Sequence, residues 1–312
     1  MPPAHTRPPA AARRVVEHLA NNHRLEPFAA PDDDRALRLP GPESAGLTYH
    51  PEVGLLIDGH RCTPGRRSLA DLLTTAPGTA GPYLYRGQEL HDQHQRGDDP
   101  VLYEFWRDLL PARTVATAYG ERTWYTDLVA YQPGVLANGE PHRSVGHWNA
   151  PSQLEVFEVL HGQVLMVAAA PRQDGELDLH AQVCAPGQSV VVPFGVWHST
   201  YVLSEPALVV NIYADVRLAH GVHTGRAAAL DPGLKYHGRP PLRVAALHPP
   251  SAGECTLTGP DLAHSHQTQV LRDLTPFDLP AHVCLVDLVL SDDDRLHTLT
   301  TRAMDSSHAP GS

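Results

Sequence analysis

The chain has 312 residues, of which 42% are hydrophobic, and this is enough for one large core or for one core with an appendage. Its net charge of -11 excludes a broad basic face, so neither nucleic acid nor an anionic membrane is an expected partner, and an anionic substrate would need local positive groups. The four cysteines form no CxxC pair, no apolar signal-peptide region follows the N-terminus, and no run approaches the roughly 18 apolar residues that span a bilayer. We therefore expect a cytoplasmic protein.

Residues 1–46 are predicted to form a partly disordered N-terminal arm. The first ten residues are rich in Pro and Ala, whereas 11–23 fit one short amphipathic helix and 27–46 have the Pro, Gly and Asp content of a linker. Further on, the segment SLADLL (68–73) predicts a short helix.

From about residue 101 to residue 214 the chain consists of short apolar runs separated by turn signals. The runs are VLYEFW, TWYTDLVAYQPG, EVFEVLHG, QVLMVAAA, LDLHAQVCAPG, SVVVPF, STYVLSE and ALVVNIY. Runs of this length, rich in Val, Tyr and Leu and punctuated by Pro-Gly pairs, indicate an all-β antiparallel sandwich or barrel.

Residues 226–312 are predicted to form a C-terminal extension. This part is rich in Pro and Asp and contains two strand-like pieces, LRVAALH and VCLVDLVL. The last dozen residues are predicted to be disordered.

Two stretches of the β-rich region carry candidate chemistry. In GHWNAPSQLEVFEVLHG, His147 and Asn149 precede Glu155, and six residues separate Glu155 from Gly162. The second stretch is PGQSVVVPFGVWH, which ends at His198. Together they resemble the two sequence motifs of the cupin superfamily, with two extra residues before His147, Asn149 in place of a histidine, and Val202 in place of a later asparagine.

Strand geometry groups the candidate ligands. Alternate side chains share a face, so His147 and Asn149 should point into the barrel, whereas Glu158 has the opposite parity to Glu155 and should point away. Imidazoles plus a carboxylate with open positions suit Fe, Mn, Ni, Co or Zn, and the sequence does not separate these divalent metals. The alternative is a cupin whose polar residues only satisfy one another's hydrogen bonds inside the barrel.

The resemblance can be narrowed to the cupin-type phosphoglucose isomerases of archaea and some bacteria. It rests on GHWN…EVFEVLHG, APGQSVVVPFGVWHSTYVL and NIYAD, and more weakly on RRSLADL and DDPVLYEFW upstream. It implies a cupin domain over 47–225, a double-stranded β-helix or jelly-roll-like barrel with short helices in the terminal extensions. It also implies a homodimer, in which VLYEFW is an extra strand able to cross to a partner barrel.

The same resemblance implies an aldose–ketose isomerase of a sugar phosphate or related sugar, in which a metal holds adjacent sugar oxygens while a proton moves. The implied metal ligands are His147, Glu155 and His198, with Asn149 at the fourth place. A base near neutrality and a group that stabilises an enediolate are needed, and Glu155, Tyr213 and His220 are the candidate catalytic residues. The candidate substrate-binding residues, in the loop before the site, are Arg143, Ser144 and Gly146.

Two other functional classes stay open at this point. The exchanged ligand, the altered phosphate loop and the extra terminal segments suit a new substrate, so the site can equally belong to a dioxygenase, an epimerase or a lyase. A cupin that binds a sugar without catalysis is the third class. Fold alone does not decide among them.

Overall fold

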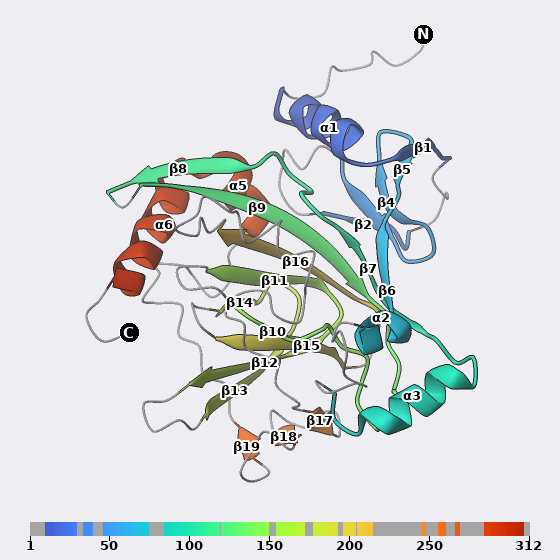
Figure 1. The fold of residues 1–312 in the computed structure, drawn as a ribbon. Coiled ribbons are helices and arrows are strands. Elements are labelled where there is room, and N and C mark those ends of the chain that lie inside the picture. Colours follow the sequence, from blue (N-terminus) through green and yellow to red (C-terminus); the bar gives the residue numbers. More distant parts are fainter. Residues whose placement is uncertain are drawn as a thin grey trace.

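Two antiparallel sheets lie one over the other at the centre of the molecule (Figure 1). The computed structural model describes residues 10–29, 34–39, 46–74, 84–118, 120–149, 154–171, 177–192, 196–203, 205–214, 245–247, 255–259, 266–268 and 284–308. The sheets, helices and contacts described are those of these residues.

The larger central sheet has seven strands. Its order is β14 (Ser189–Val192), β11 (Glu155–His161), β16 (Ala207–Ala214), β9 (Gly120–Tyr131), β7 (Val101–Trp106) and β6 (Gly65–Ser68), and β8 (Arg113–Thr117) also pairs with β9. The smaller central sheet has four strands, in the order β10 (His147–Trp148), β15 (Trp197–Val202), β12 (Val164–Pro171) and β13 (Leu177–Cys184). The prediction of an all-β domain is confirmed. Over the described residues the strands form two open sheets, the layers of a β-sandwich, rather than a closed barrel.

The two faces of the larger sheet bury different cores because alternate residues of each strand point to opposite sides. Val159 and Val209 face the smaller sheet and belong to a core with Val164 and Met166 of β12. Their neighbours of opposite parity, such as Val210, belong to a second core with the terminal helices. The first face therefore lines the space between the sheets.

The N-terminal arm packs on this outer core. It contains α1 (Ala10–Asn22), as predicted, and it contributes two strands to a five-stranded sheet. The order of this sheet is β1 (Leu25–Pro27), β5 (His60–Cys62), β4 (Gly54–Ile57), β3 (Thr48–His50) and β2 (Leu37–Arg38). This sheet crosses the domain boundary predicted between 46 and 47. The predicted helix at SLADLL is α2 (Leu69–Thr74), and α3 (Gly87–Gln95) follows it.

Two expectations for the C-terminal extension are wrong. VCLVDLVL has a strand-like composition, but Leu285–Ser291 is helix α5, with Leu285, Val286, Leu288 and Val289 buried. A short apolar run fits either state by periodicity, and here the one-sided burial at helical spacing decides. The last dozen residues are expected to be disordered, yet α6 (Asp293–His308) includes most of them.

Between the central sheets and α5 in the chain, the described residues form a small sheet of β17 (Ala245–Leu247), β18 (Cys255–Thr258) and β19 (His266–Thr268). The strand expected in LRVAALH is therefore present, as β17.

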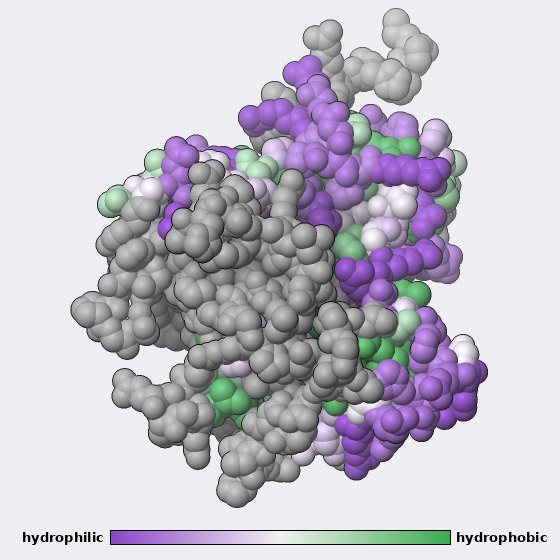
Figure 2. Space-filling model, in the orientation of Figure 1, coloured by the Kyte–Doolittle hydropathy of each residue, from purple (hydrophilic) through white to green (hydrophobic). Residues whose placement is uncertain are grey.

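The surface is largely polar where it is described. Hydrophilic residues cover the regions of α1 and α3 in Figure 2, and Val101 and Val135 are the exposed large hydrophobic residues of the described part. In that part, none of the helices has the length and apolar character needed to cross a membrane.

Candidate metal centre

Two histidines face each other across the short pairing of β10 with β15. His147 is directly opposite His198 in the antiparallel register, and their ring centroids are 4.3 Å apart. Opposite residues of an antiparallel pair point to the same face of the sheet. Strand register therefore brings together two histidines that lie far apart in sequence.

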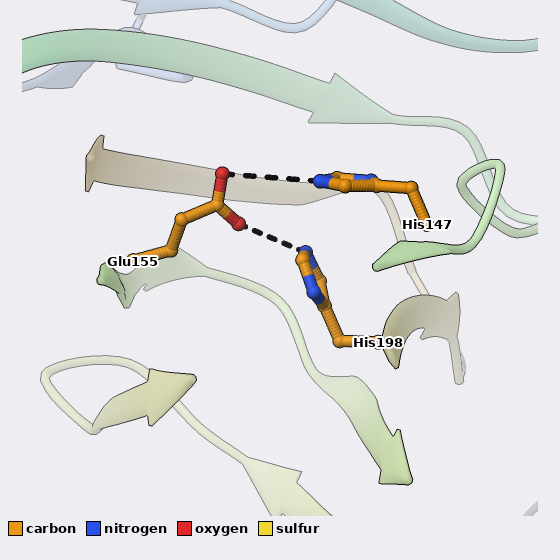
Figure 3. Close-up of side chains that lie close together, drawn as sticks. All are labelled: His147, Glu155 and His198. Carbon is orange, nitrogen blue, oxygen red and sulfur yellow. Dashed lines mark ion pairs between the residues drawn. The ribbon is translucent and has the colours of Figure 1, made fainter. Parts of the chain in front are cut away.

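The carboxylate of Glu155 reaches these imidazoles from the other sheet (Figure 3). Its Oε2 lies 2.9 Å from Nε2 of His198, and its Oε1 lies 3.9 Å from Nε2 of His147. Glu155 and His198 are buried, and His147 is partly exposed. The candidate ligand atoms of the three residues lie within 4.8 Å of one another.

This donor set fits a divalent transition metal. Metal–nitrogen and metal–oxygen bonds of about 2.0–2.2 Å place neighbouring ligand atoms roughly 3–4 Å apart, close to the spacing here. Two imidazoles and one carboxylate leave coordination positions for water or substrate, an arrangement used by non-haem iron and catalytic zinc sites. The residues would bind such an ion with only small side-chain movements.

Tyr213 lies beside Glu155, as its candidate catalytic role requires. It is the register partner of Glu155 on β16, it is buried, and its ring centroid is 5.7 Å from that of Tyr125 on β9. Glu155, Tyr213 and Tyr125 thus form one row on the face that lines the space between the sheets.

Asn149 is buried and tied to the strand opposite Glu155. Its side-chain nitrogen donates to the carbonyl of Val192, 3.2 Å away, and Val192 is the register partner of Glu155 on β14. The side chain therefore links the segment after β10 to the end of β14. Its place as a fourth ligand stays a prediction.

Glu158 confirms the expected strand parity. Its carboxylate accepts the N–H of Leu285 at 2.8 Å, on the side of the sheet where α5 packs. Burial raises the pKa of Glu158 to about 7, while the Leu285 hydrogen bond acts in the opposite direction. Glu158 thus supports the C-terminal helix and takes no part in the candidate centre.

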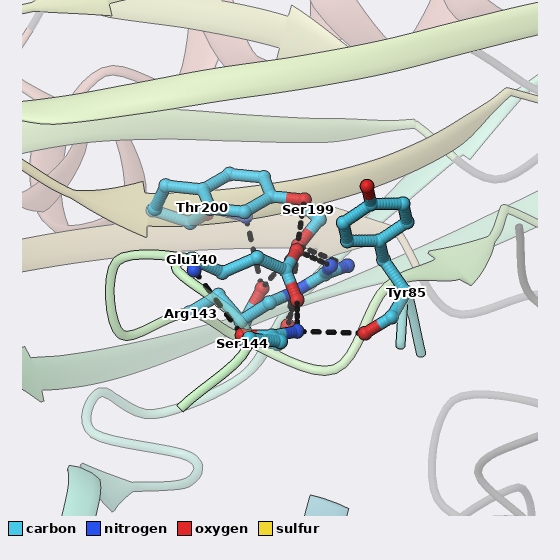
Figure 4. Close-up of polar contacts among 8 residues, drawn as sticks. Tyr85, Glu140, Arg143, Ser144, Ser199 and Thr200 are labelled. Atoms are coloured by element: carbon cyan, nitrogen blue, oxygen red, sulfur yellow. Dashed lines mark hydrogen bonds and ion pairs between the residues drawn. The ribbon is translucent and has the colours of Figure 1, made fainter. Parts of the chain in front are cut away.

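Arg143, a predicted substrate-binding residue, lies inside a network of protein contacts (Figure 4). Its Nη1 donates to Glu140 at 2.7 Å, Nη2 donates to Ser199 at 3.2 Å, and its guanidinium lies 4.6 Å from the ring centroid of Tyr201. The side chain is 1% exposed. Such a residue stabilises the loop before β10, and its contact with substrate stays a prediction.

Ser144 and Gly146 also have packing roles. The hydroxyl of Ser144 accepts the N–H of Thr200 at 2.9 Å, which joins the loop to β15. A Cβ added at Gly146 would lie 2.1 Å from the ring of Trp197, so only glycine fits this approach. Their substrate contacts are untested, and His220 lies outside the described residues, as do Pro193 and Gly195 of the second motif.

An ion pair near the candidate centre, with a buried carboxylate and a half-exposed arginine, was missed in the sequence. Asp127 of β9 is fully buried and pairs with Arg107, which follows β7. Asp127 shares a row with Asn211 and Phe157, and the ring centroid of Phe157 is 5.4 Å from that of His198. The signal was present: an aspartate inside the apolar run TWYTDLVAY has to find a partner when the strand is buried.

Comparison with known proteins gives no close relative. No family model and no curated protein matches the chain. Solved structures with partial similarity include oxalate oxidase with glycolate (19% identity, TM-score 0.24, covering 29% of this chain and 41% of that chain). Another is KdgF from Halomonas sp., with 13% identity and a TM-score of 0.25, covering 36% of this chain and 77% of that chain. A third is the cupin domain of Schizosaccharomyces pombe Cnp3, with 10% identity and a TM-score of 0.25, covering 37% of this chain and 74% of that chain. The chain thus spans less than half of the oxalate oxidase chain, and similarity at this level transfers no activity.

Proposed function

We propose that this protein is a metal-dependent enzyme whose centre is formed by His147, Glu155 and His198. The observation that carries the proposal is the convergence of three ligand side chains, from three separate strands, within 4.8 Å. Three titratable groups brought together between two sheets, with two of them buried, are a costly arrangement for packing alone.

The reaction we propose is the isomerisation of a sugar phosphate or related sugar by proton transfer between adjacent carbons. A bound divalent metal would supply a Lewis acid that stabilises the negative charge of an enediolate. The chain itself has to position the sugar and move the proton. Glu155 and Tyr213 are neighbours in register and both are buried, so a proton can pass between substrate and either group with little competition from water.

The experiment combines metal analysis with an anaerobic isomerase assay. Purified protein is stripped with a chelator, reloaded separately with Fe, Mn, Ni, Co or Zn, and assayed for interconversion of glucose 6-phosphate and fructose 6-phosphate without oxygen. The proposal predicts about one metal per chain and turnover that depends on it. The control is Glu158→Gln, which alters the same strand on its opposite face. A protein that retains no metal after reloading overturns the proposal.

A second candidate reaction is an oxygen-dependent oxidation. Two histidines with one carboxylate are the ligand set of many non-haem iron oxygenases, and this is the donor set found here. Oxygen uptake by the iron-loaded protein, with no isomerase turnover, would favour this candidate. Stabilisation by sugars with neither activity would favour a sugar-binding cupin.

A further inference from the structure

Arg107 extends the inward-facing side of β7 toward the candidate centre. Tyr103 and Phe105 are opposite Tyr131 and Val129 in register, and Arg107 continues their alternation past the end of the strand. Its Nη1 forms an ion pair with Asp127, which lies on the same face of β9. The positive charge is therefore held on the side of the sheet that carries Glu155.

Asp127 fixes this arginine in place. One carboxylate oxygen pairs with Arg107, and the other accepts the N–H of Asp108 at 3.0 Å. Asp127 is completely buried, whereas the side chain of Arg107 is 52% exposed. Within the described part of the chain, Arg107 makes its one ion pair through Nη1, and this leaves the other edge of the guanidinium for a ligand.

The ring of Phe105 is in contact with a second arginine besides Arg107. The guanidinium carbons of Arg107 and Arg67 lie 5.1 Å and 5.2 Å from the ring centroid of Phe105. A Cβ added at Gly65 would lie 2.4 Å from this ring, so the glycine makes room for it. Two arginines on one ring, each also near a carboxylate, bring two sets of guanidinium donors together on a chain with a net charge of -11.

The electrostatics couple Arg107 to the row that contains Glu155 and Tyr213. The negative charge of Asp127 raises the pKa of Arg107, burial acts in the opposite direction, and Tyr213 raises the pKa further. The side chain of Arg107 stays half exposed beside the buried carboxylate of Asp127. Its electrostatic coupling to Tyr213 reaches the register partner of Glu155.

The distance between Asp127, which holds Arg107, and Glu155 of the candidate metal centre indicates the kind of substrate. Asp127 is two strands and two residues from Glu155, which by standard strand dimensions is about 12 Å between Cα atoms. The side chains of Asp127 and Glu155 both point to the face that lines the space between the sheets. A sugar phosphate can extend from one group to the other, whereas a two-carbon diacid cannot.

We propose that Arg107, supported by Arg67, binds the phosphate group of the substrate whose sugar end lies at His147, Glu155 and His198. This inference rests on the proposed function and adds to it an anion site at Arg107. Charge-assisted hydrogen bonds to an arginine fork are strong and directional, and this makes Arg107 a determinant of specificity.

The test measures phosphate binding by the chelated, metal-free protein. Glucose 6-phosphate, inorganic phosphate, glucose and gluconate are titrated calorimetrically into wild type and into Arg107→Gln/Asp127→Asn, which removes both charges so that no carboxylate is left buried alone. We expect about 10–100-fold weaker binding of glucose 6-phosphate by the variant, as for the loss of hydrogen bonds to a charged group. The control is Arg66→Gln/Glu104→Gln, which removes an ion pair 2.9 Å apart on the opposite face of β6 and β7 and should bind like wild type.

Several outcomes would overturn the inference. They are equal binding by wild type and the double variant, equal loss in the control, and binding of gluconate in preference to glucose 6-phosphate. If the double variant fails to fold, Arg107→Lys decides, because it retains the charge but loses the planar fork and should bind the phosphate ester more weakly. Because binding is measured without metal, loss of phosphate binding supports the anion site even if the isomerase assay fails. Metal-dependent turnover with unchanged phosphate binding would refute the anion site alone.

Discussion

At the residue scale, the alternation of side chains along β11 places a candidate metal ligand on one face of the strand and a structural carboxylate on the other. Glu155 and Glu158 are three residues apart on one strand, yet the first meets two imidazoles and the second meets the N-terminus of α5. A one-residue slip of the strand would exchange these roles. The two glutamates therefore test the register of the candidate centre directly.

We predict that His198→Ala abolishes metal retention and activity, whereas Glu158→Ala leaves the metal content unchanged. His198 contacts Glu155 of β11 at 2.9 Å, and Glu158 lies on the opposite face of β11. Metal content after gel filtration, measured by mass spectrometry, checks this. Equal metal loss in the two variants would mean that the ligand register is wrong.

Substitution of Asn149 by histidine should raise metal affinity. An amide oxygen binds imidazole-preferring metals less well than a histidine does, and even second-shell changes shift affinity by roughly 10–100-fold, so the gain should be at least of this order. Turnover of the native substrate should fall or shift, because an open coordination position is lost. Competitive chelation of wild type and Asn149→His measures the affinity. An unchanged affinity would show that Asn149 acts only through its hydrogen bond to Val192.

At the element scale, α5 is attached to the larger sheet at both ends. The N–H of Leu285 donates to Glu158 at its start, and Nη1 of Arg113 donates to the carbonyl of Val289 at 2.7 Å near its end. Arg113 also pairs with Asp293 at the start of α6. These contacts dock the C-terminal helices on the outer core, opposite the candidate centre.

The buried Glu158 should make stability depend on pH. Its pKa is raised from 4.5 to about 7 in the folded chain, so between these values the folded state holds a proton that the unfolded state has lost. The contribution of Glu158 to the free energy of unfolding is fully present below about pH 4.5, decreases as pH rises, and is lost above about pH 7. The total change in the free energy of unfolding is about 3 kcal/mol.

Glu158→Gln should therefore be less sensitive to pH than wild type and more stable above pH 7. Urea unfolding from pH 5 to pH 8 measures the difference, with the exposed Glu121→Gln as the matched control. Parallel stability curves for wild type and Glu158→Gln would contradict the prediction.

At the scale of the whole molecule, the expected homodimer stays a prediction. The family resemblance suggests that the strand VLYEFW crosses to a partner, but β7 pairs with β9 on one side and β6 on the other within the chain. Both edges of the strand are thus occupied, and a dimer would use another surface. Light scattering at micromolar concentration should give twice the chain mass of 33.9 kDa, and a monomer mass alone would refute the dimer.

The sequence by itself determined the parts of this protein that depend on local patterns. Short apolar runs separated by turn signals predicted the strands, α1 and α2 followed from short helical patterns, and motif spacing selected His147, Glu155 and His198 as a group. Strand alternation also assigned Glu158 to the outer face. The strand, helix and parity predictions held because each depends on residues a few positions apart, whereas the group of three ligands was selected by the spacing of two motifs.

Only the tertiary structure decided features that depend on partners distant in sequence. Whether an arginine is open to a ligand is set by what surrounds it, and here Glu140 and Tyr201 enclose Arg143 while Arg107 stays half exposed. The apolar run of α5 is a helix because it packs by one face on the outer core, as an amphipathic helix does on a sheet. Burial and charge pairing are long-range free-energy terms, and a local pattern cannot fix them in advance.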